Sequence, residues 1–590
     1  MSTAPAGQVQ LPRALEFWAS MDETRIIKHG GRRWSIRPDA AEPLLAGGWP
    51  PNNPERLTPV KTAPGRRVLR FEIAGRGYYV KAYEAGGPLR RLRAWLGLGP
   101  GRREWDALLA ARAVGLEVPE PVALALGPPE TLITREIAGG QRLDDYLFAR
   151  YFEAGPNDPP YPGARPPELV AAFRRRRTPP EGTIDPRSLA YRLADLVAQL
   201  AEANLCLPDL HPGNLLIGSP RGEWRLSLVD LAEARDASSD SVLEHLMQLE
   251  HFFEPIASPA ERRRCLVRLQ ELLPGAPPAR SVADATAVYR QRFYLRRDRR
   301  TRRPSKYFRR IAAGPWRGWA ADDWADAVEA LLAGIPGAGP LFGDKATLLK
   351  EGRTSTVWRV RLDDGRSLII KRHNRAQSRG PVRGLLGASR SMTAFRRGHA
   401  LLVRGVATAR PAAAADLRRG GAVGDTLLAT EPIEGALPLP EWLRGNPPAA
   451  LRRHVTWELA RMVQRMHAMG LAHRDLKAPN ILVAPADGPS PRPVLVDLDG
   501  LVRTRRVSVR RRIQNLMRLS VSLDEWGVAR PTDRLRFLRA YLAPRGCPAP
   551  ITLLARRRGK TAAAQRLRRW WKRIARASAR KLEALRRKAP

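Results

Sequence analysis

The chain has 590 residues and a formal net charge of +44, from 102 Lys and Arg against 58 Asp and Glu. This length excludes a single hydrophobic core and predicts about four folding units at roughly 150 residues each. A hydrophobic content of 43% is ordinary for a globular protein, and the basic excess indicates either a polyanionic partner or a solvated, Arg-rich surface.

Cysteine usage and the N-terminus bear on the compartment. The cysteines lie far apart and form no CxxC pair, which fits a reducing cytosol, and they are Cys206, Cys265 and Cys547. Residues 1–11 show no basic stretch followed by an apolar run, so we expect no signal peptide. No uninterrupted apolar stretch approaches about 18 residues, so we expect no membrane-spanning helix and a cytoplasmic protein.

The first half begins with a loose leader and continues with strand and helix signals. Two strands flank a glycine turn, and a helix with apolar residues on one side follows. A third strand, an inserted loop rich in Pro and Arg, and a second helix complete this half. The expected ranges are 68–73 and 78–83 for the strands, 102–114 for the helix, 131–136 for the third strand, 159–180 for the loop and 189–204 for the second helix.

The second half repeats this order of elements. Strands are expected at 357–360 and 367–371, a helix at 395–403 and a further strand at 426–431. The repetition indicates a duplication at the scale of a domain rather than a short repeat. We therefore expect a leader at 1–22, a first domain at 23–330 with an insertion near 153–186, a linker at 331–341, a second domain at 342–555 and a basic tail at 556–590.

Each half contains one short pattern that carries chemistry. An Asp precedes an Asn by five residues, and another Asp follows after an apolar run. This is the arrangement of a kinase catalytic loop and its metal-binding Asp, and it predicts phosphoryl transfer from a nucleotide. The residues in that order are Asp209, Asn214 and Asp230 in the first half, and Asp475, Asn480 and Asp497 in the second.

The roles follow from what phosphoryl transfer needs, which is positioning and charge neutralisation. The first Asp of each set would accept the proton of the acceptor hydroxyl, while the Asn and the second Asp would ligate Mg²⁺. Lys81 and Lys371 lie at strand ends, where a lysine would hold the phosphates of ATP. The chain uses Arg almost everywhere else, so a Lys at both positions is informative.

Further candidates surround these sets. Gly352 and Ser355 lie in a weak match to a phosphate-covering glycine loop, for which a plain β-turn is an equal reading. Glu104 lies where a helix Glu would pair with Lys81, but the second half has Ala394 or Phe395 there, so Lys371 has no evident anionic partner. The residues expected to support the catalytic loops are His473, Arg474, Lys477 and His211.

Both halves resemble the protein-kinase-like superfamily, and within it the bacterial lipopolysaccharide kinases that phosphorylate Kdo or heptose. The resemblance spans about 55–310 and 340–550 and is carried by the runs 473–480, 497–500 and 534–542 and, in the first half, by 103–105 and 209–214. It implies an α+β fold of two tandem bilobal domains, each with a small antiparallel-sheet N-lobe and a helical C-lobe. It also implies ATP, Mg²⁺ and a sugar hydroxyl of a lipopolysaccharide-type glycolipid, or another phosphorylated sugar, as acceptor.

The departures from the family pattern leave alternatives open. Leu207 and Pro208 replace the usual His-Arg before the catalytic Asp of the first half, and no A-P-E motif follows either set. Both halves could be active, or one could be inactive. An atypical protein serine/threonine kinase and a pseudokinase scaffold that binds nucleotide or polyanion are the competing functions, while nucleic-acid binding rests on charge alone.

The basic tail has two readings. Leu567, Trp570, Trp571 and Ile574 follow helical spacing within a strongly basic segment. Such a helix suits an anionic membrane surface, which would place the protein on the inner face of the bacterial inner membrane. Packing of the same apolar residues onto a helical lobe is an equal alternative.

Overall fold

The structure is a computed structural model of the whole chain. It describes residues 24–29, 31–46, 54–63, 65–84, 86–127, 129–153, 174–175, 180–218, 224–254, 257–335, 345–352, 355–373, 389–419, 422–543 and 557–587. These residues form two compact units. The first holds the described residues of 1–150, 180–253 and 260–286, and the second holds those of 151–179, 254–259 and 287–590.

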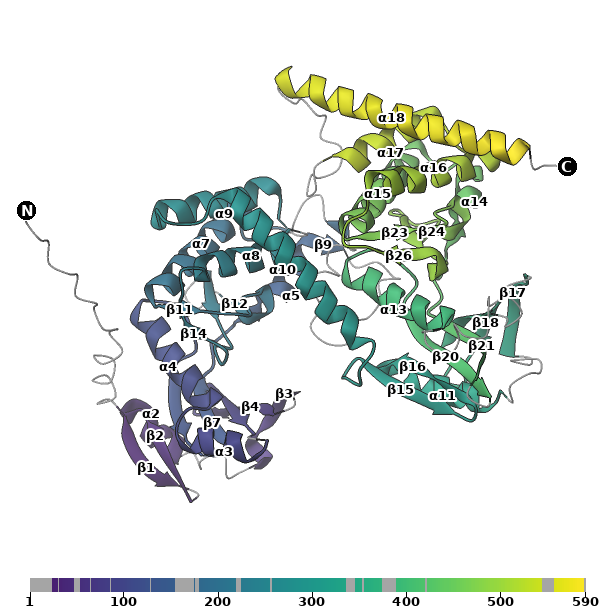
Figure 1. Cartoon of the computed structure of the whole chain (residues 1–590). Helices are drawn as coiled ribbons and strands as arrows, with labels where there is room; N and C mark the ends of the chain where they lie inside the picture. The colour runs from purple at the N-terminus through teal and green to yellow at the C-terminus, as the bar shows by residue number, and fades with distance from the viewer. Residues whose placement is uncertain are drawn as a thin grey trace, which may run out of the picture. The chain divides into compact units, whose positions relative to one another are not determined.

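The first unit is built on an antiparallel sheet of seven strands in the order β1-β2-β6-β7-β5-β4-β3 (Figure 1). The strands are β1 (Arg25–His29), β2 (Arg32–Ile36), β3 (Thr58–Ala63), β4 (Arg66–Ile73), β5 (Arg76–Tyr83), β6 (Pro121–Ala125) and β7 (Glu130–Arg135). Helix α4 (Pro100–Ala113) packs on β6 and β7 and carries Glu104 toward β5.

The rest of the first unit is mainly helical. Its helices are α2 (Pro38–Ala46), α3 (Pro88–Trp95), α5 (Leu143–Tyr151), α7 (Pro186–Glu202), α8 (Ser241–Phe253) and α9 (Pro259–Leu272), and the division between the units falls within α10 (Ala279–Arg300). Short strands β8 (Gln141–Arg142), β12 (Leu215–Gly218) and β13 (Arg225–Leu228) form a small sheet, and β11 (Leu205–Cys206) pairs with β14 (Arg235–Asp236). The candidate catalytic loop lies between β11 and β12 and includes η4 (Pro212–Asn214).

The second unit has a seven-stranded antiparallel sheet with the same succession, β15-β16-β20-β21-β19-β18-β17. In both sheets the first two strands form a hairpin that pairs with the sixth strand, through β2 and β6 in one and β16 and β20 in the other. The strands are β15 (Phe308–Ala313), β16 (Trp316–Ala321), β17 (Ala346–Lys350), β18 (Ser355–Arg361), β19 (Ser367–His373), β20 (Pro411–Arg419) and β21 (Ala422–Thr430).

This pairing corrects one expected boundary. The first domain was expected to extend to residue 330, but β15 and β16 are hydrogen-bonded to β20 and so belong to the second sheet. Helix α11 (Ala325–Ala333), which follows them, packs on β15 and β16. The hairpin carries no catalytic motif, so the motif-based reading had no signal for it. The boundary therefore lies before Phe308.

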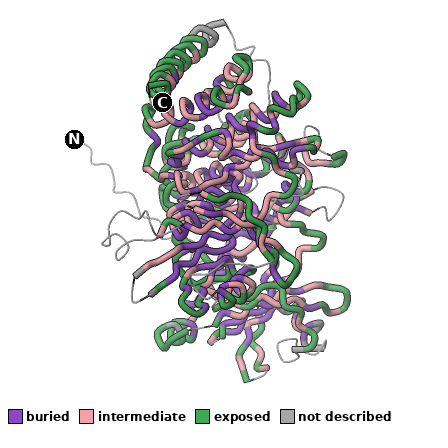
Figure 2. The backbone as a smooth tube through the Cα atoms, turned by 90° about the vertical axis from the view of Figure 1, so that its right-hand side faces the viewer, coloured by how far each residue is buried: buried purple, intermediate pink, exposed green. Residues whose placement is uncertain are grey.

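The two faces of the second sheet bury different partners. Because side chains alternate along a strand, Ala413 and Ala415 pack with α11, whereas Ala414 faces α13 (Arg390–Val403) and the helical core. Phe395 of α13 is fully buried in that core. Figure 2 shows the buried positions in purple along the interior strands, while the C-terminal helix is mostly green and exposed.

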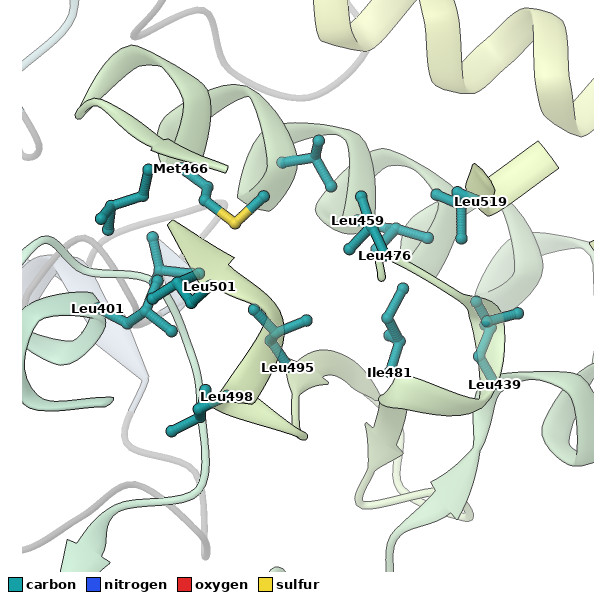
Figure 3. Close-up of a cluster of buried hydrophobic side chains, with 14 of the residues drawn as sticks. Leu401, Leu439, Leu459, Met466, Leu476, Ile481, Leu495, Leu498, Leu501 and Leu519 are labelled. Carbon is teal, nitrogen blue, oxygen red and sulfur yellow. The ribbon is translucent and has the colours of Figure 1, made fainter. Parts of the chain in front are cut away.

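The helical part of the second unit surrounds the second candidate catalytic loop. Its helices are α14 (Leu439–Arg444), α15 (Ala449–Ala468), α16 (Val509–Glu525), α17 (Pro531–Leu542) and α18 (Arg557–Arg586). The short elements are β22 (Leu437–Pro438), β23 (Leu471–His473), η8 (Ala478–Asn480), β24 (Ile481–Ala484), β25 (Arg492–Leu495), η9 (Leu498–Gly500) and β26 (Leu501–Arg503). Buried leucines and Ile481 converge between these elements (Figure 3).

Local sequence explains where the main helices begin. Asp185 caps α7 by accepting a hydrogen bond from Ser188 N–H, and Pro186 occupies the first turn. Ser389 caps α13 and Ser508 caps α16 in the same way, through their hydroxyls. These caps satisfy backbone donors that a helix start leaves unpaired.

The expected strands and helices of both halves are confirmed within a few residues of their predicted ends. The leader at 1–22 and most of the insertion near 153–186 lie outside the described residues. So do residues 336–344, which include the second part of the expected linker. Within the insertion, β9 (Phe152–Glu153) pairs with β10 (Arg174–Arg175). None of the helices in the described part of the chain has the length and apolarity to cross a bilayer.

The tail forms helix α18 and packs on α16 and α17. Leu567, Trp570 and Ile574 pack against the helical core of the second unit, so this stripe faces the protein. Trp571 is different, because it is 38% exposed. The structure therefore favours the packing alternative for three of the four apolar residues.

Candidate active site

Lys371 of β19 lies beside the turn that follows β25. Its Nζ is 2.6 Å from Asp497 Oδ1 and 2.9 Å from Asp499 Oδ2. Burial alone would lower the pKa of Lys371, but the charges of Asp499 and Asp497 outweigh it and raise the pKa. The ammonium group is therefore held in its charged form between two carboxylates.

The sequence showed no acid for Lys371 on the helix at 395–403, and the structure gives Asp499 as its anionic partner. His373 Nε2 lies 3.5 Å from Asp499 Oδ1, and Arg390 lies 3.4 Å from Asp499 Oδ2. Burial would raise the pKa of Asp499, but the nearby His373 ring and the Lys371 ammonium outweigh burial and hold the pKa well below its usual range. Asp499 is less exposed than Asp497, at 14% against 37% of its side chain.

His473 joins the catalytic loop to the segment that carries Asp497. Its Nδ1 accepts a hydrogen bond from Asp475 N–H at 3.2 Å, and its Nε2 lies 2.8 Å from the Asp497 carbonyl oxygen. Because Nδ1 accepts, Nε2 must carry the proton and donate it to that carbonyl. Burial lowers the pKa of His473, which keeps the ring neutral. A Cβ on Gly500 would lie 2.7 Å from the ring, so this close approach requires glycine.

The backbone of His473 is itself fixed from α16. Asn515 Oδ1 accepts a hydrogen bond from His473 N–H at 3.0 Å, and Asn515 Nδ2 donates to the His473 carbonyl at 2.9 Å. His467 of α15 lies 2.9 Å from the same Oδ1. All three residues are buried, so the amide clamp holds the loop in one conformation.

The catalytic-loop Asp475 is held through its backbone and stays accessible through its carboxylate. Asn480 Nδ2 donates to the Asp475 carbonyl at 3.0 Å, which closes the five-residue loop predicted from the sequence. Lys477 Nζ lies 3.2 Å from Asp475 Oδ1. Arg474 N–H donates to the Gly500 carbonyl at 2.6 Å, while the Arg474 side chain is exposed.

The candidate phosphate-covering turn connects β17 and β18. Gly352 precedes the turn, and Ser355 begins β18 opposite His373 of β19. Lys371, two residues before His373, pairs with Val357 in the same register. Residues 353–354 of this turn lie outside the described part of the chain.

In the first unit Lys81 of β5 pairs with Glu104 of α4. Lys81 Nζ lies 2.5 Å from Glu104 Oε1, and the Glu104 side chain is fully buried. Glu104 also accepts hydrogen bonds from Tyr83 OH and, at 3.2 Å, from Leu231 N–H. Burial raises the pKa of Tyr83, and the charge of Glu104 adds to this, so the phenol stays protonated and donates. The expected pairing of Lys81 with Glu104 is therefore present.

The first catalytic loop has the same Asn-to-Asp bond as the second. Asn214 Nδ2 donates to the Asp209 carbonyl at 3.0 Å, the same distance as its counterpart. His211 Nδ1 accepts from Gly213 N–H, and its Nε2 lies 3.5 Å from Asp209 Oδ2. Asp230, like Asp497, has a left-handed backbone, with φ of 65° against 58°. A non-glycine residue in this region is strained and is held there by its surroundings.

The carboxylate of Asp230 has a partner that Asp497 lacks. Arg66 at the start of β4 donates to both of its oxygens, at 2.5 Å to Oδ1 and 2.9 Å to Oδ2. Burial would raise the pKa of Asp230, but the Arg66 hydrogen bonds and the charge of Lys81 outweigh it and lower the pKa to about 2. The candidate metal carboxylate of the first unit is thus held as a bidentate ion pair.

Comparison with known proteins identifies the family of this chain. A family model described as the lipopolysaccharide kinase (Kdo/WaaP) family matches residues 348–541. A 3-deoxy-D-manno-octulosonic acid kinase of Xylella fastidiosa (strain M12) is 31% identical over 225 residues, which cover 35% of this chain and 84% of the relative. The chain belongs to this lipopolysaccharide kinase family.

One further curated protein and one solved structure that resemble this family member have related names. The lipopolysaccharide core heptose(I) kinase WaaP of Pseudomonas aeruginosa is 30% identical over 241 residues, or 38% of this chain and 82% of the relative. A solved structure titled "WaaP in complex with acyl carrier protein" is 25% identical and covers 42% of this chain and 91% of that chain, at a TM-score of 0.28.

Kinase families use ATP, generally with Mg²⁺, and the second unit of this lipopolysaccharide kinase family member offers suitable donors. Asp497 supplies carboxylate oxygens, and Asn480 uses its Nδ2 on the Asp475 carbonyl, which leaves its Oδ1 as an acceptor. Mg²⁺ prefers oxygen ligands and commonly takes one or two from the protein, with water and phosphate oxygens completing the octahedron. The donor set therefore fits this ion.

Two residues that shape these sites were absent from the predicted set. Asp499 was visible as the second acid of the Asp497-Leu498-Asp499 run, and its spacing placed it on the same turn as Asp497. Arg66 follows Gly65 in the hairpin turn, but nothing in a chain so rich in Arg marks this one. Only the folded register brings Arg66 to Asp230, which lies 164 positions away in sequence.

Proposed function

We propose that the chain is a tandem of two bilobal kinase-like domains, of which the second transfers the γ-phosphoryl group of ATP. The acceptor is a sugar hydroxyl of a lipopolysaccharide-type glycolipid. The observation that supports this most is the convergence of Lys371 on Asp497, beside a catalytic loop in which Asn480 is bonded to Asp475. The shared strand order and loop bonds support the tandem arrangement.

The residues of the second unit have separate tasks in this reaction. The Lys371 ammonium binds phosphate oxygens of ATP, and Asp499 holds it in place. Asp475 accepts the proton of the acceptor hydroxyl as that oxygen bonds to the γ-phosphorus and the bond to the β-phosphate oxygen breaks, which releases ADP. Mg²⁺, held by Asp497 and Asn480, would supply charge neutralisation on the phosphates. His473 keeps Asp475 and Asp497 at a fixed separation.

The acceptor class comes from the relatives, whose names give Kdo and heptose as the sugars they phosphorylate. A sugar acceptor requires the hydroxyl to reach Asp475, whose side chain is partly exposed. Cationic side chains near Asp475 and Asp499 suit an anionic substrate, and they are Arg390, Arg397, Arg474 and Lys477.

A peripheral membrane location is proposed from α18. Its outward residues include Arg568, Arg569, Lys572, Arg573 and Arg576, all exposed, and Trp571 lies among them. A basic surface of this kind attracts anionic lipid headgroups at the cytoplasmic face of a membrane. We expect the full chain to sediment with anionic vesicles and to lose this binding at high salt. Equal binding to neutral vesicles would contradict the proposed membrane location.

The experiment that tests the enzymatic proposal follows a labelled γ-phosphate. The full chain is incubated with labelled ATP, Mg²⁺, a Kdo–lipid acceptor, a heptose-containing core acceptor and a generic protein acceptor. We expect label in one of the sugars and its loss in Asp497→Asn, because the substituted amide no longer carries charge for Mg²⁺.

The matched control is Asp487→Asn, an exposed acid outside the site, which should keep the transfer rate. Label in the protein acceptor alone would replace the sugar-kinase proposal with the protein-kinase alternative. Label transfer that survives Asp497→Asn would remove the second unit as the site of the reaction.

A further inference from the structure

The two units hold different groups at one equivalent position of their sheets. In β18, Ser355 lies opposite His373, two residues beyond Lys371. In β4, Arg66 lies opposite Tyr83, two residues beyond Lys81. The register therefore places Arg66 of the first unit where the second unit has Ser355, next to the turn expected to cover phosphates.

Neighbouring contacts support this equivalence. Tyr83 donates to Glu104, the carboxylate that holds Lys81, and His373 lies 3.5 Å from Asp499, the carboxylate that holds Lys371. Val229 N–H donates to the Asn214 carbonyl at 2.9 Å, and the corresponding bond in the second unit joins Val496 to Asn480 at the same distance. The two sites thus share a backbone frame, within which Arg66 is a cation that the second unit does not have at the equivalent position.

That cation lies where a metal ion would need to bind. Both carboxylate oxygens of Asp230 accept from Arg66, and the side chains are only 19% and 26% exposed. A divalent cation would have to displace a guanidinium and remain next to its positive charge.

We infer that the first unit binds a nucleoside triphosphate without magnesium, with Arg66 in the position of the metal ion, and does not transfer phosphate. This inference rests on the proposed kinase-like character of the first unit. A guanidinium has five N–H donors in a rigid fork, and two nitrogens on Asp230 leave further donors for phosphate oxygens.

The surrounding charges suit that ligand. Lys81, Arg66 and Lys61 all act on Asp230, against the two acids Asp230 and Glu104. The balance is a net positive charge at the place where phosphates are expected, which attracts an anion before any metal is added. The second unit differs because, among the described residues, no arginine pairs with Asp497: Lys371 contacts one oxygen of Asp497 and also Asp499, so a divalent cation at Asp497 has no guanidinium to displace.

The test is calorimetric titration of the full chain with the β,γ-imido analogue of ATP, in Mg²⁺ and in EDTA. We expect two equivalents to bind in Mg²⁺ and one in EDTA. Arg66→Ala should weaken the EDTA-resistant binding by at least about 10-fold, because the bidentate donor is lost. Lys371→Ala should remove the magnesium-dependent equivalent and keep the other.

Arg67→Ala is the matched control, because Arg67 neighbours Arg66 on β4 but forms an exposed pair with Glu84. If Arg66→Ala does not fold, Arg66→Lys keeps the charge without the fork and should still weaken the EDTA-resistant binding by about 10-fold. No binding in EDTA, or EDTA-resistant binding that both Arg66 variants keep, overturns the inference. Phosphate transfer by the second unit is a separate readout, so its absence would leave this result unaffected.

Discussion

The two units differ in the source of the carboxylate that holds the strand lysine. In the first unit Glu104 reaches Lys81 from helix α4. In the second unit Asp499 reaches Lys371 from the turn just after Asp497. An ion pair on the strand lysine is thus supplied from different places in the sequence, so the lysine requires an acid nearby in space and not at a given motif position.

The position of the acid that holds the lysine affects the contacts of the candidate Mg²⁺-binding aspartates, Asp497 and Asp230. Because Asp499 lies two residues from Asp497, Lys371 contacts both, and Asp497 keeps an oxygen for other ligands. In the first unit the acid lies on a separate helix, and Arg66 takes both oxygens of Asp230. This difference is the basis of our proposal that the second unit is the catalytic one.

The largest expected effect is a loss of phosphate transfer that occurs on substitution of Asp475 and not of Asp209. Asp475→Asn should lower kcat for phosphate transfer by about 10³-fold, because general-base catalysis contributes 10²–10⁴-fold. Asp209→Asn should change it less than about two-fold if the first unit is silent. Steady-state transfer measured on the full chain checks both, and equal losses in the two variants would break the comparison.

A smaller loss is expected when Lys371 loses its buried partner. Asp499→Asn should lower kcat/KM by about 10- to 100-fold, because a lysine displaced by about 1 Å no longer meets the phosphates. The affected step is nucleotide binding, so the loss should appear largely in KM for ATP. Asp487→Asn is the control, and an Asp499→Asn enzyme with unchanged KM and kcat would contradict the assigned pairing.

The corresponding change in the first unit should affect stability instead. Glu104→Gln leaves Lys81 without its buried partner and should destabilise the first unit by about 3 kcal/mol, with transfer unchanged. Hydrogen exchange of α4 and α15 amides reports the two units separately. Glu117→Gln, which breaks an exposed pair with Arg225, should cost less than about 1 kcal/mol.

The smallest effect should be common to both units and depend on pH. Burial lowers the pKa of His245 in the first unit and of His467 in the second to about 4 in each case. Between about pH 6.5 and 4 the unfolded chain binds protons that the folded chain excludes, so stability falls as pH falls through this window. At pH 5 the loss is about 2 kcal/mol for each histidine.

Hydrogen exchange at pH 7 and pH 5 checks this loss in each unit. His245→Gln should flatten the dependence in the first unit alone, since Gln does not titrate and can still accept from Leu207 N–H. Equal pH dependence of the first unit with and without this change would contradict the role of His245.

The strands, the main helices and the spacing of both catalytic loops could be predicted from the sequence, because hydrophobic periodicity and fixed motif spacing are local signals. It missed the hairpin β15–β16, whose membership is decided by pairing with β20 about 100 residues later in the chain. It also missed Arg66 as a partner of Asp230, because an ion pair between distant segments depends on the register of the folded sheet. The tail illustrates the same limit, since one apolar stripe suits a membrane or a protein core equally.

The most direct test of the account compares Asp497→Ala and Asp230→Ala in the full chain, by the rate of labelled phosphate transfer to the sugar acceptor. The account predicts that Asp497→Ala falls to background and that Asp230→Ala keeps the wild-type rate within about two-fold. Transfer lost in Asp230→Ala and retained in Asp497→Ala would contradict it.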